Sequence, residues 1–304
     1  MTLARFGVVG TGTWARAVHI PAALSSGRAE LVAVLCRDPS RMPALGAGVS
    51  VYTEVEEFLD AVDIVGFAVP PHVQDELAAT AIARGKHVLL EKPVSTTAEV
   101  AQRLAHAAQE KGIHSITFFP HRLDPVLSGW SRDMREHGAW WAGRVEAFSS
   151  VLVDEGSPFH SSQWRHDSGG LWDIGPHAVA QLCAVLGNVA SVCAQEGAGK
   201  IVSVSLGHKN GAQSSIALGA SFPAPAPDGI GTYFIGERGR ALQPGFDDWI
   251  TTARGAYGAA IESLVDQMQN RVGSHVSDIH FGAHVTSVLA AAERSMASGR
   301  AETV

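Results

Sequence analysis

The chain has 304 residues, a length that predicts about two domains with a core each, since one domain commonly takes about 150 residues. Its formal net charge is 23 − 30 = −7 with neutral histidines, and Lys and Arg form no run that could follow a phosphate backbone, so we expect no nucleic-acid partner. Hydrophobic residues make up 46% and charged residues 17%, a composition typical of a compact globular protein and not of a disordered chain.

Cysteine usage and the first residues of the chain bear on its compartment. Cys36, Cys183 and Cys193 are odd in number and widely spaced, with no Cys-x-x-Cys pair, so we expect reduced thiols. Residues 1–12 do not have the layout of a signal peptide, and no segment approaches the about 20 apolar residues that cross a bilayer. The sequence therefore predicts a cytoplasmic protein with no membrane partner.

In the first third of the chain, short β-branched runs alternate with longer segments of helical periodicity. The predicted strands are residues 5–9, 31–35, 63–69, 87–91 and 114–118. The predicted helices are residues 14–24, 55–61, 73–84 and 97–111. Gly85 and Gly112 follow the last two, as glycine commonly does at a helix end. This alternation predicts an α/β fold with a doubly wound parallel sheet.

After about Pro125 the pattern changes, because long β-rich segments follow one another with few helices between them. The predicted strands are residues 143–153, 189–195, 200–208, 213–222 and 232–235, with a turn at 209–211 and a surface loop at 223–228. Helices are predicted at residues 170–186, 257–271 and 279–298. We therefore expect a first domain over residues 1–122 and a second, α+β domain with an antiparallel sheet over residues 123–304, whose closing helices can pack back on the first.

Residues 10–15 read G-T-G-T-W-A, directly after the first predicted strand and at the start of a helix. This is the G-x-G-x-x-G/A pattern in the context that dinucleotide binding requires. The first glycine permits a tight turn, the second lets the main chain approach a pyrophosphate, and the alanine lets the helix pack on the strand. N–H groups at the helix start favour the anion. The predicted coenzyme contacts are Gly10, Gly12, Thr13, Trp14 and Ala15.

The residues after the second strand favour NADP over NAD. Proteins that bind NAD commonly place an acid there to accept a hydrogen bond from the ribose 2′-hydroxyl, and Cys36 stands where that acid is expected. Arg37 and Arg41 can bind a 2′-phosphate through charged hydrogen bonds. One alternative stays open, in which both arginines are solvated, Asp38 takes the place of the acid and the coenzyme is NAD.

Two further strings accompany the glycine motif. Glu91-Lys92-Pro93 follows a predicted strand, where open α/β sheets bind their ligands, and Trp164-Arg165 precedes G-G-L-W-D-I-G-P-H at residues 169–177. Together the strings resemble the Gfo/Idh/MocA family of NAD(P)-dependent oxidoreductases, and the resemblance covers nearly the whole chain. It implies an N-terminal Rossmann domain that binds NAD(P), and a C-terminal α+β domain with a large, mostly antiparallel sheet for substrate binding and dimerisation.

The resemblance implies that Lys92, Asp173 and His177 line the substrate pocket beside the nicotinamide. Hydride transfer at a carbinol carbon also moves a proton, and histidine titrates near neutral pH, so His177 is the predicted proton donor and acceptor. Asp173 can orient the imidazole from four residues earlier on the helix, and Lys92 can stabilise a developing alkoxide. Read alone, Asp173 and His177 also fit a surface charge pair or half a metal site, but His160 and His166 have no clear ligand spacing and we expect no metal.

Further contacts follow from the resemblance, together with departures from the family pattern. The implied coenzyme contacts are Pro70, Gln74, Glu91, Lys92, Trp164 and Arg165, and His121 is an implied substrate contact. A buried tryptophan and a salt-bridged arginine would fit Trp164 and Arg165 as well. Many members carry a histidine at the place of Gln74, and an acid at that of Ala180. Pro120 and His121 replace an amide and an arginine, so the substrate is not specified.

We predict an NAD(P)-dependent oxidoreductase that acts on the CH–OH or carbonyl group of a sugar, cyclitol or related small molecule. Two alternatives stay open. One is a non-catalytic dinucleotide-binding regulator, although such members tend to lose the lysine or the histidine. The other is a lyase or hydrolase that keeps its coenzyme bound. The strands at residues 200–208 and 213–222 have partly apolar faces that need covering, so we expect a homodimer or homotetramer.

Overall fold

The protein forms two compact units in its computed structural model, which describes residues 3–41, 45, 48–223, 230–245, 248–269 and 271–304. The first unit consists of Met1–Asp124 with Phe246–Ala283, and the second of Pro125–Gly245 with His284–Val304. The expected boundary at residues 122/123 therefore lies beside the first division. The expected second domain is interrupted by a segment that groups with the first unit.

A parallel sheet of six strands, in the order β3-β2-β1-β4-β5-β6, forms the middle of the first unit. Its strands are β1 (Ala4–Val9), β2 (Ala29–Leu35), β3 (Ser50–Tyr52), β4 (Ile64–Phe67), β5 (His87–Leu90) and β6 (Ser115–Thr117). All neighbouring pairs are parallel, which confirms the predicted doubly wound sheet. Strand β3 was not predicted, because three largely exposed residues carry no alternating pattern.

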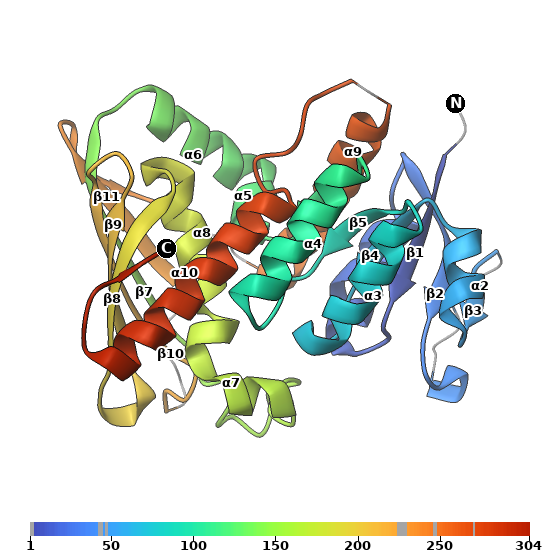
Figure 1. Ribbon diagram of the computed structural model, residues 1–304, viewed down its shortest axis with the longest axis horizontal. Helices are drawn as coiled ribbons and strands as arrows, with labels where there is room; N and C mark the ends of the chain where they lie inside the picture. Colours follow the sequence, from blue (N-terminus) through green and yellow to red (C-terminus); the bar gives the residue numbers. More distant parts are fainter. Residues whose placement is uncertain (1–2, 42–44, 46–47, 224–229, 246–247, 270) are drawn as a thin grey trace. The chain divides into compact units, whose positions relative to one another are not determined.

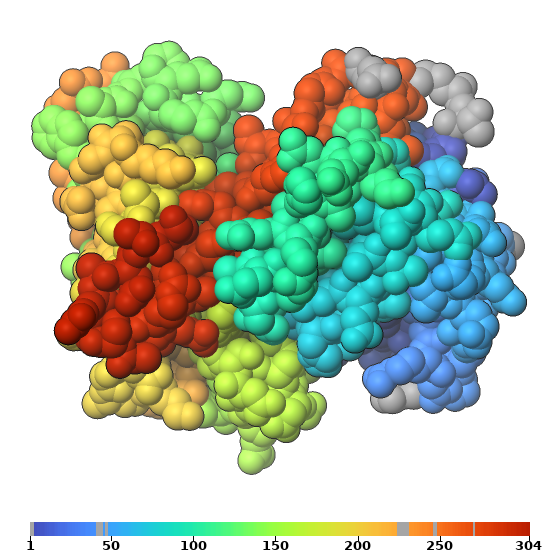
Figure 2. Space-filling model, viewed as in Figure 1, coloured from blue at the N-terminus to red at the C-terminus, as the bar shows by residue number. Residues whose placement is uncertain are grey.

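Helices connect these strands or pack beside them (Figure 1). They are the π-helix η1 (Ala15–His19), α1 (Ile20–Leu24), the 3-10 turn η2 (Pro39–Arg41), α2 (Val55–Ala61), α3 (Pro71–Ala83), α4 (Ala98–Glu110), α5 (Pro120–Leu123) and α9 (Trp249–Met268). Gly85 and Gly112 have φ values of 74° and 64°, each directly after the C-cap residue of α3 or α4, which confirms their predicted place at helix ends. Figure 2 shows the side chains of α3 and α4 side by side over one face of this unit.

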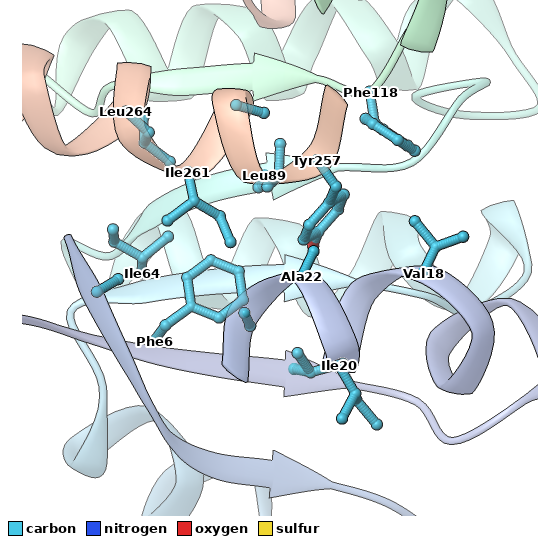
Figure 3. Close-up of a cluster of buried hydrophobic side chains, with 14 of the residues drawn as sticks. Phe6, Val18, Ile20, Ala22, Ile64, Leu89, Phe118, Tyr257, Ile261 and Leu264 are labelled. Atoms are coloured by element: carbon cyan, nitrogen blue, oxygen red, sulfur yellow. The ribbon is translucent and has the colours of Figure 1, made fainter. Parts of the chain in front are cut away.

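Helix α9 supplies part of the core of the first unit, although it lies far along the chain from the sheet it covers. Figure 3 shows Tyr257, Ile261 and Leu264 from α9 beside Phe6 of β1 and Leu89 of β5. The rings of Phe6 and Tyr257 meet edge to face with centroids 6.4 Å apart, a favoured arrangement for aromatic pairs. The core of the first unit therefore depends on residues from the second half of the sequence.

The second unit contains a sheet of seven strands, in the order β12-β11-β7-β10-β9-β8-β13. Its strands are β7 (Trp140–Phe148), β8 (Val189–Glu196), β9 (Val202–His208), β10 (Gln213–Gly219), β11 (Ile230–Gly236), β12 (Gly239–Leu242) and β13 (Glu302–Thr303). The pair β7–β10 is parallel and the other pairs are antiparallel, which confirms a mostly antiparallel sheet. The strand predicted at 143–153 ends at Phe148, and residues 224–229 of the predicted loop lie outside the described residues.

Helices cover one face of this sheet. They are α6 (Pro125–Glu136), α7 (Gln163–Asp173), α8 (Gly175–Leu186) and α10 (Ile279–Ser298), with the 3-10 turn η3 (Ala198–Lys200) between β8 and β9. Along β9, Val202, Val204 and Leu206 are buried while Ser203 and Ser205 are exposed, so the strand has a core face and an open face. Within the described part of the chain, no helix combines the length and apolarity needed to cross a bilayer.

Candidate active site

The glycine loop lies at the carboxyl edge of the parallel sheet, directly after β1. Gly10 has a φ of 102°, and a Cβ atom there would come within 2.5 Å of the Ala68 carbonyl oxygen, so only glycine fits. Its N–H donates to the Leu35 carbonyl at 2.9 Å, which ties the loop to the end of β2. At Gly12 a Cβ atom would meet no described atom within 4 Å. The second glycine thus faces open space, as expected where a main chain approaches a pyrophosphate.

The helix that follows the loop fits the rest of the dinucleotide pattern. Ala15 begins η1 and has no exposed surface, in agreement with its predicted packing role. The Arg16 N–H donates to the Gly12 carbonyl at 3.1 Å, and Thr13 is exposed. No acidic residue stands in the first turn, so nothing there opposes an anion at the helix start.

The residues after β2 form a short turn in which Asp38 is held by its neighbour. Asp38 Oδ1 accepts hydrogen bonds from the Ser40 N–H at 3.1 Å and from the Ser40 hydroxyl at 2.6 Å. Cys36 is buried, and burial raises the pKa of its thiol. Arg37 is exposed, and Arg41 ends η2. Among the described side chains, this turn therefore presents the exposed Arg37 guanidinium together with a carboxylate that is engaged locally.

The Gln74 side chain, from the first turn of α3, holds the loop that carries Lys92. Its Nε2 donates to the carbonyls of Glu91 at 3.0 Å, Pro93 at 3.3 Å and Val94 at 3.0 Å, and its Oε1 accepts from the Glu91 N–H at 2.8 Å. Gln74 has no exposed surface. The expectation that it contacts the coenzyme is therefore corrected, because its polar atoms point into the protein and bind the main chain beside Lys92.

The Glu91 carboxylate links the glycine loop and its helix to the lysine loop. Its Oε1 accepts from Trp14 Nε1 at 2.8 Å and lies 2.8 Å from His19 Nε2, while its Oε2 accepts from the Lys92 N–H at 3.1 Å. Glu91 was expected to contact the coenzyme directly. The structure shows three protein groups around this carboxylate, and its side chain is 12% exposed.

Behind Glu91 lies a buried aromatic cluster that sequence patterns did not indicate. The His19 ring stacks on Tyr257 with centroids 4.1 Å apart and meets Phe118 edge to face at 5.8 Å. Burial and the nearby charge of Glu91 raise the pKa of Tyr257 well above its ordinary value, so its hydroxyl stays protonated. That hydroxyl has no hydrogen-bond partner among the described residues, and Gly66 leaves room for it.

A second aromatic group joins the glycine loop to His121. Trp14 stacks on Trp249, the first residue of α9, with centroids 6.3 Å apart, and the His121 ring lies 5.5 Å from that of Trp249. His121 is buried, and burial lowers its pKa to about 4. The imidazole expected to contact substrate is therefore neutral near pH 7.

In the second unit, Arg165 and Asp173 form an ion pair. Arg165 Nε lies 3.2 Å from Asp173 Oδ2, and the two side chains are 18% and 11% exposed. The Arg165 guanidinium also donates to the Ser162 hydroxyl at 3.1 Å and lies over the rings of Phe159 and Trp164. This agrees with the alternative, kept open in the sequence analysis, that Arg165 forms a salt bridge. It also makes Arg165 a direct neighbour of Asp173, a predicted catalytic residue.

His177 lies in the first turn of α8, and its N–H donates to the Ile174 carbonyl at 3.0 Å. The single helix predicted over residues 170–186 is instead divided, since α7 ends at Asp173 and α8 begins at Gly175. Pro176 explains the division, because it lacks an N–H and its ring disfavours a continuous helix before it. Asp173 and His177 therefore sit at facing ends of two consecutive helices.

The predicted residues thus fall into one group in each unit. Gly10, Trp14, Glu91 and the main chain of Lys92 come together at the carboxyl edge of the parallel sheet, and Pro70 directly precedes α3 after β4. The second group comprises Trp164, Arg165, Asp173 and His177. Among the described residues, no three His, Cys, Asp or Glu side chains are arranged to hold a metal ion.

Comparison with known proteins agrees with this arrangement. Residues 4–118 match the family model GFO_IDH_MocA, described as an oxidoreductase family with an NAD-binding Rossmann fold. The rhizopine catabolism protein MocA of Rhizobium meliloti is 33% identical over 188 residues, 60% of this chain and 57% of that protein. The dTDP-3,4-didehydro-2,6-dideoxy-alpha-D-glucose 3-reductase of Saccharopolyspora spinosa is 31% identical over 181 residues, 56% of this chain and 52% of that protein. These matches span about half the length of each relative.

The fold is similar over its whole length to that of a solved structure. A putative myo-inositol dehydrogenase from Sinorhizobium meliloti 1021 superposes with a TM-score of 0.82 and 20% identity, covering 100% of both chains. At that identity the likeness concerns the fold alone. Through residues 4–118 the chain is similar to the GFO_IDH_MocA oxidoreductase family, which has an NAD-binding Rossmann fold.

Proposed function

We propose that this protein is an NAD(P)-dependent oxidoreductase that transfers a hydride between nicotinamide and the carbinol or carbonyl carbon of a sugar, cyclitol or related small molecule. The observation that carries the proposal is the Glu91 carboxylate, which binds both Trp14 of the glycine loop and the Lys92 main chain. It supports a single site in which the lysine lies beside the bound coenzyme. The open space at Gly12 supports a fit for the pyrophosphate.

In the proposed mechanism, a bound nicotinamide would supply or take up the hydride, and four side chains manage charge and protons. The Lys92 ammonium stabilises negative charge on the substrate oxygen. His177 donates a proton to that oxygen in reduction and accepts one in oxidation. The Asp173 carboxylate, paired with the Arg165 guanidinium, accepts hydrogen bonds from the imidazole or from a substrate hydroxyl.

We propose NADP as the preferred coenzyme. Three features of the turn after β2 support this preference: the buried Cys36 at the place of the usual acid, the exposed Arg37, and the engagement of Asp38 by Ser40. A 2′-phosphate would find a guanidinium there, whereas a 2′-hydroxyl would compete with Ser40 for the carboxylate. The test is an Arg37→Glu variant, for which we expect weaker binding of NADPH by at least about tenfold and little change for NADH. Equal losses for both coenzymes would contradict the preference.

The proposed substrate class rests on relatives and on pocket chemistry. One relative is named as a reductase of a dTDP-linked deoxysugar, and one similarly folded chain as a putative myo-inositol dehydrogenase. Ammonium, imidazole and carboxylate groups suit a substrate with several hydroxyl or carbonyl oxygens, because each can bind one of them. We therefore propose sugars and cyclitols as the first substrate class to test.

The decisive experiment is a turnover panel. The protein would be mixed with NADP or NAD and with myo-inositol, D-glucose or dTDP-glucose, and the absorbance of reduced nicotinamide followed. Lys92→Met and His177→Ala should each lower kcat by at least about 10²-fold, with the coenzyme Kd changed less than about threefold. Coenzyme binding without turnover of any polyol or carbonyl compound would favour a regulator. Product formed without net coenzyme reduction would favour a lyase or hydrolase.

A further inference from the structure

We propose that Gln74 is a positioning residue, which fixes the place of Lys92 by binding the main chain on both sides of it. The inference rests on the proposed function, in that Lys92 must act on the substrate. Gln74 binds the residue before Lys92 and the two residues after it through four hydrogen bonds of 2.8–3.3 Å. Lys92 is thereby held at the middle of a clamped loop.

The amide of glutamine matches this loop in the kind of its polar groups, because it carries both donors and an acceptor. Its two N–H donors are shared among three carbonyls of the loop, and its oxygen accepts from the one N–H that the loop presents. The side chain has no exposed surface, so water does not replace these bonds if they are lost. A neutral histidine, with one donor and one acceptor, would serve only part of the set.

Gln74 is itself anchored on a rigid element. Its N–H donates to the Pro70 carbonyl at 3.0 Å in the first turn of α3. The next residue, Asp75, accepts from the buried Ser95 hydroxyl at 2.9 Å, so two consecutive residues of α3 hold the segment that follows β5. Movement of this segment would therefore require breaking contacts with the helix.

A fixed main chain matters for a lysine because its side chain is long and flexible. An ammonium at the end of four methylene groups reaches a substrate oxygen reproducibly only if its Cα is well placed. Misplacement of a reacting group by about 1 Å can cost about 10²-fold in rate. The Gln74 contacts therefore bear on kcat through Lys92, without contact to substrate or coenzyme.

The test compares Gln74→Met with Gln267→Met in turnover of myo-inositol or dTDP-glucose, whichever the panel shows to react. Gln267 is a matched control, since it is 1% exposed, lies in the same unit on α9, and donates within that helix to the Ser263 carbonyl. We expect Gln74→Met to lower kcat by about 10²-fold with a coenzyme Kd changed less than about threefold, and Gln267→Met to change neither. Gln74→His should give an intermediate kcat.

A double-mutant cycle separates positioning from general structural damage. In a Lys92→Met background, Gln74→Met should change the residual kcat less than about threefold, because it acts through a side chain that is no longer present. An equal loss in both backgrounds, or full kcat in a folded Gln74→Met or Gln74→His variant, would overturn the inference alone. Full kcat in Lys92→Met would overturn the proposed function and this inference with it.

A measurement without turnover completes the test. Reductive methylation with ¹³C-formaldehyde places an NMR label on the lysine amines, and Lys92→Met identifies the Lys92 signal. We expect Gln74→His to shift or broaden that signal and Gln267→Met to leave it unchanged. An unchanged signal in folded Gln74→His would overturn the inference.

Discussion

At the scale of single residues, Gly10 and Gly12 serve the coenzyme loop for different physical reasons. Gly10 is needed by the protein itself, because its φ is 102° and the Ala68 carbonyl closes the space that a side chain would use. Gly12 has an ordinary backbone conformation and open space around it. The two glycines of one motif can therefore be separated by mutation.

We expect Gly10→Ala to lower the free energy of unfolding by about 2 kcal/mol or more, because the Cβ atom meets backbone and the φ value disfavours alanine. Gly12→Ala should change that free energy by less than about 0.5 kcal/mol but weaken coenzyme binding at least about tenfold. Urea unfolding and titration with NADPH measure the two effects. Unchanged NADPH affinity in Gly12→Ala would contradict the proposed pyrophosphate site.

How much of the site the sequence predicts depends on whether its contacts are local. The glycine loop and Lys92 are predictable, because each follows a strand in a short motif. The neighbours of Glu91 are not, since the His19 contact depends on how a helix packs beside the end of β5. The place of Tyr257 depends on a distant helix, and no periodicity shows which strand that helix covers.

At the scale of elements, the strands and helices of the first unit were predicted well where apolar runs were long. Strands at residues 87–91 and 114–118 correspond to β5 and β6, and the helix at 55–61 corresponds to α2. The short β12 and β13 were missed, because strands of four and two residues show no alternation. Pairing was also beyond the sequence, since the parallel contact of β7 with β10 joins segments far apart in the chain.

The bend within α7 gives a prediction at this scale. Gly169 has φ 68° and ψ −172°, a region that glycine alone occupies readily, and its Cβ position is open. We expect Gly169→Ala to lower the free energy of unfolding by about 1–3 kcal/mol through backbone strain. Gly273→Ala is the control, since its Cβ position is also open and its φ is not positive, and it should change stability by less than about 0.5 kcal/mol. Equal free energies of unfolding for Gly169→Ala and Gly273→Ala, measured in urea, would contradict the proposed backbone strain at Gly169.

At the scale of the whole molecule, stability should fall in mild acid. Burial lowers the pKa of His121 in the first unit from 6.5 to about 4. In the second unit, burial together with the charges of Lys209 and His208 lowers the pKa of His284 from 6.5 to about 4. The unfolded chain takes up these protons near pH 6.5 and the folded chain only near pH 4, so protons favour unfolding between these values.

We therefore expect the free energy of unfolding to decrease as the pH falls from about 6.5 to about 4, by up to about 3 kcal/mol for each histidine. His284→Gln keeps an acceptor for the Val189 N–H but does not titrate. It should therefore reduce the slope of the free energy of unfolding against pH. Urea unfolding at several pH values measures this. A slope in His284→Gln equal to that of the natural protein would contradict the assignment.

Assembly is a second prediction at this scale. Trp141 on β7, Ile235 on β11 and Leu242 on β12 are 59%, 43% and 64% exposed. Large apolar side chains on neighbouring strands favour coverage by another surface. We expect a homodimer or homotetramer by light scattering at micromolar concentration, and a shift towards monomer for Trp141→Lys. A monomer mass for the natural protein would contradict this expectation.

Helix α9 also limits how the coenzyme-binding half can be transplanted or dissected. Tyr257, Ile261 and Leu264 have no accessible surface, so a fragment ending at Asp124 would leave the opposing side of β1 and β5 bare. Expressed alone, such a fragment should aggregate, whereas one that carries residues 248–269 on a linker should remain in solution. A chimera that exchanges this half between relatives must therefore carry two separate stretches of sequence.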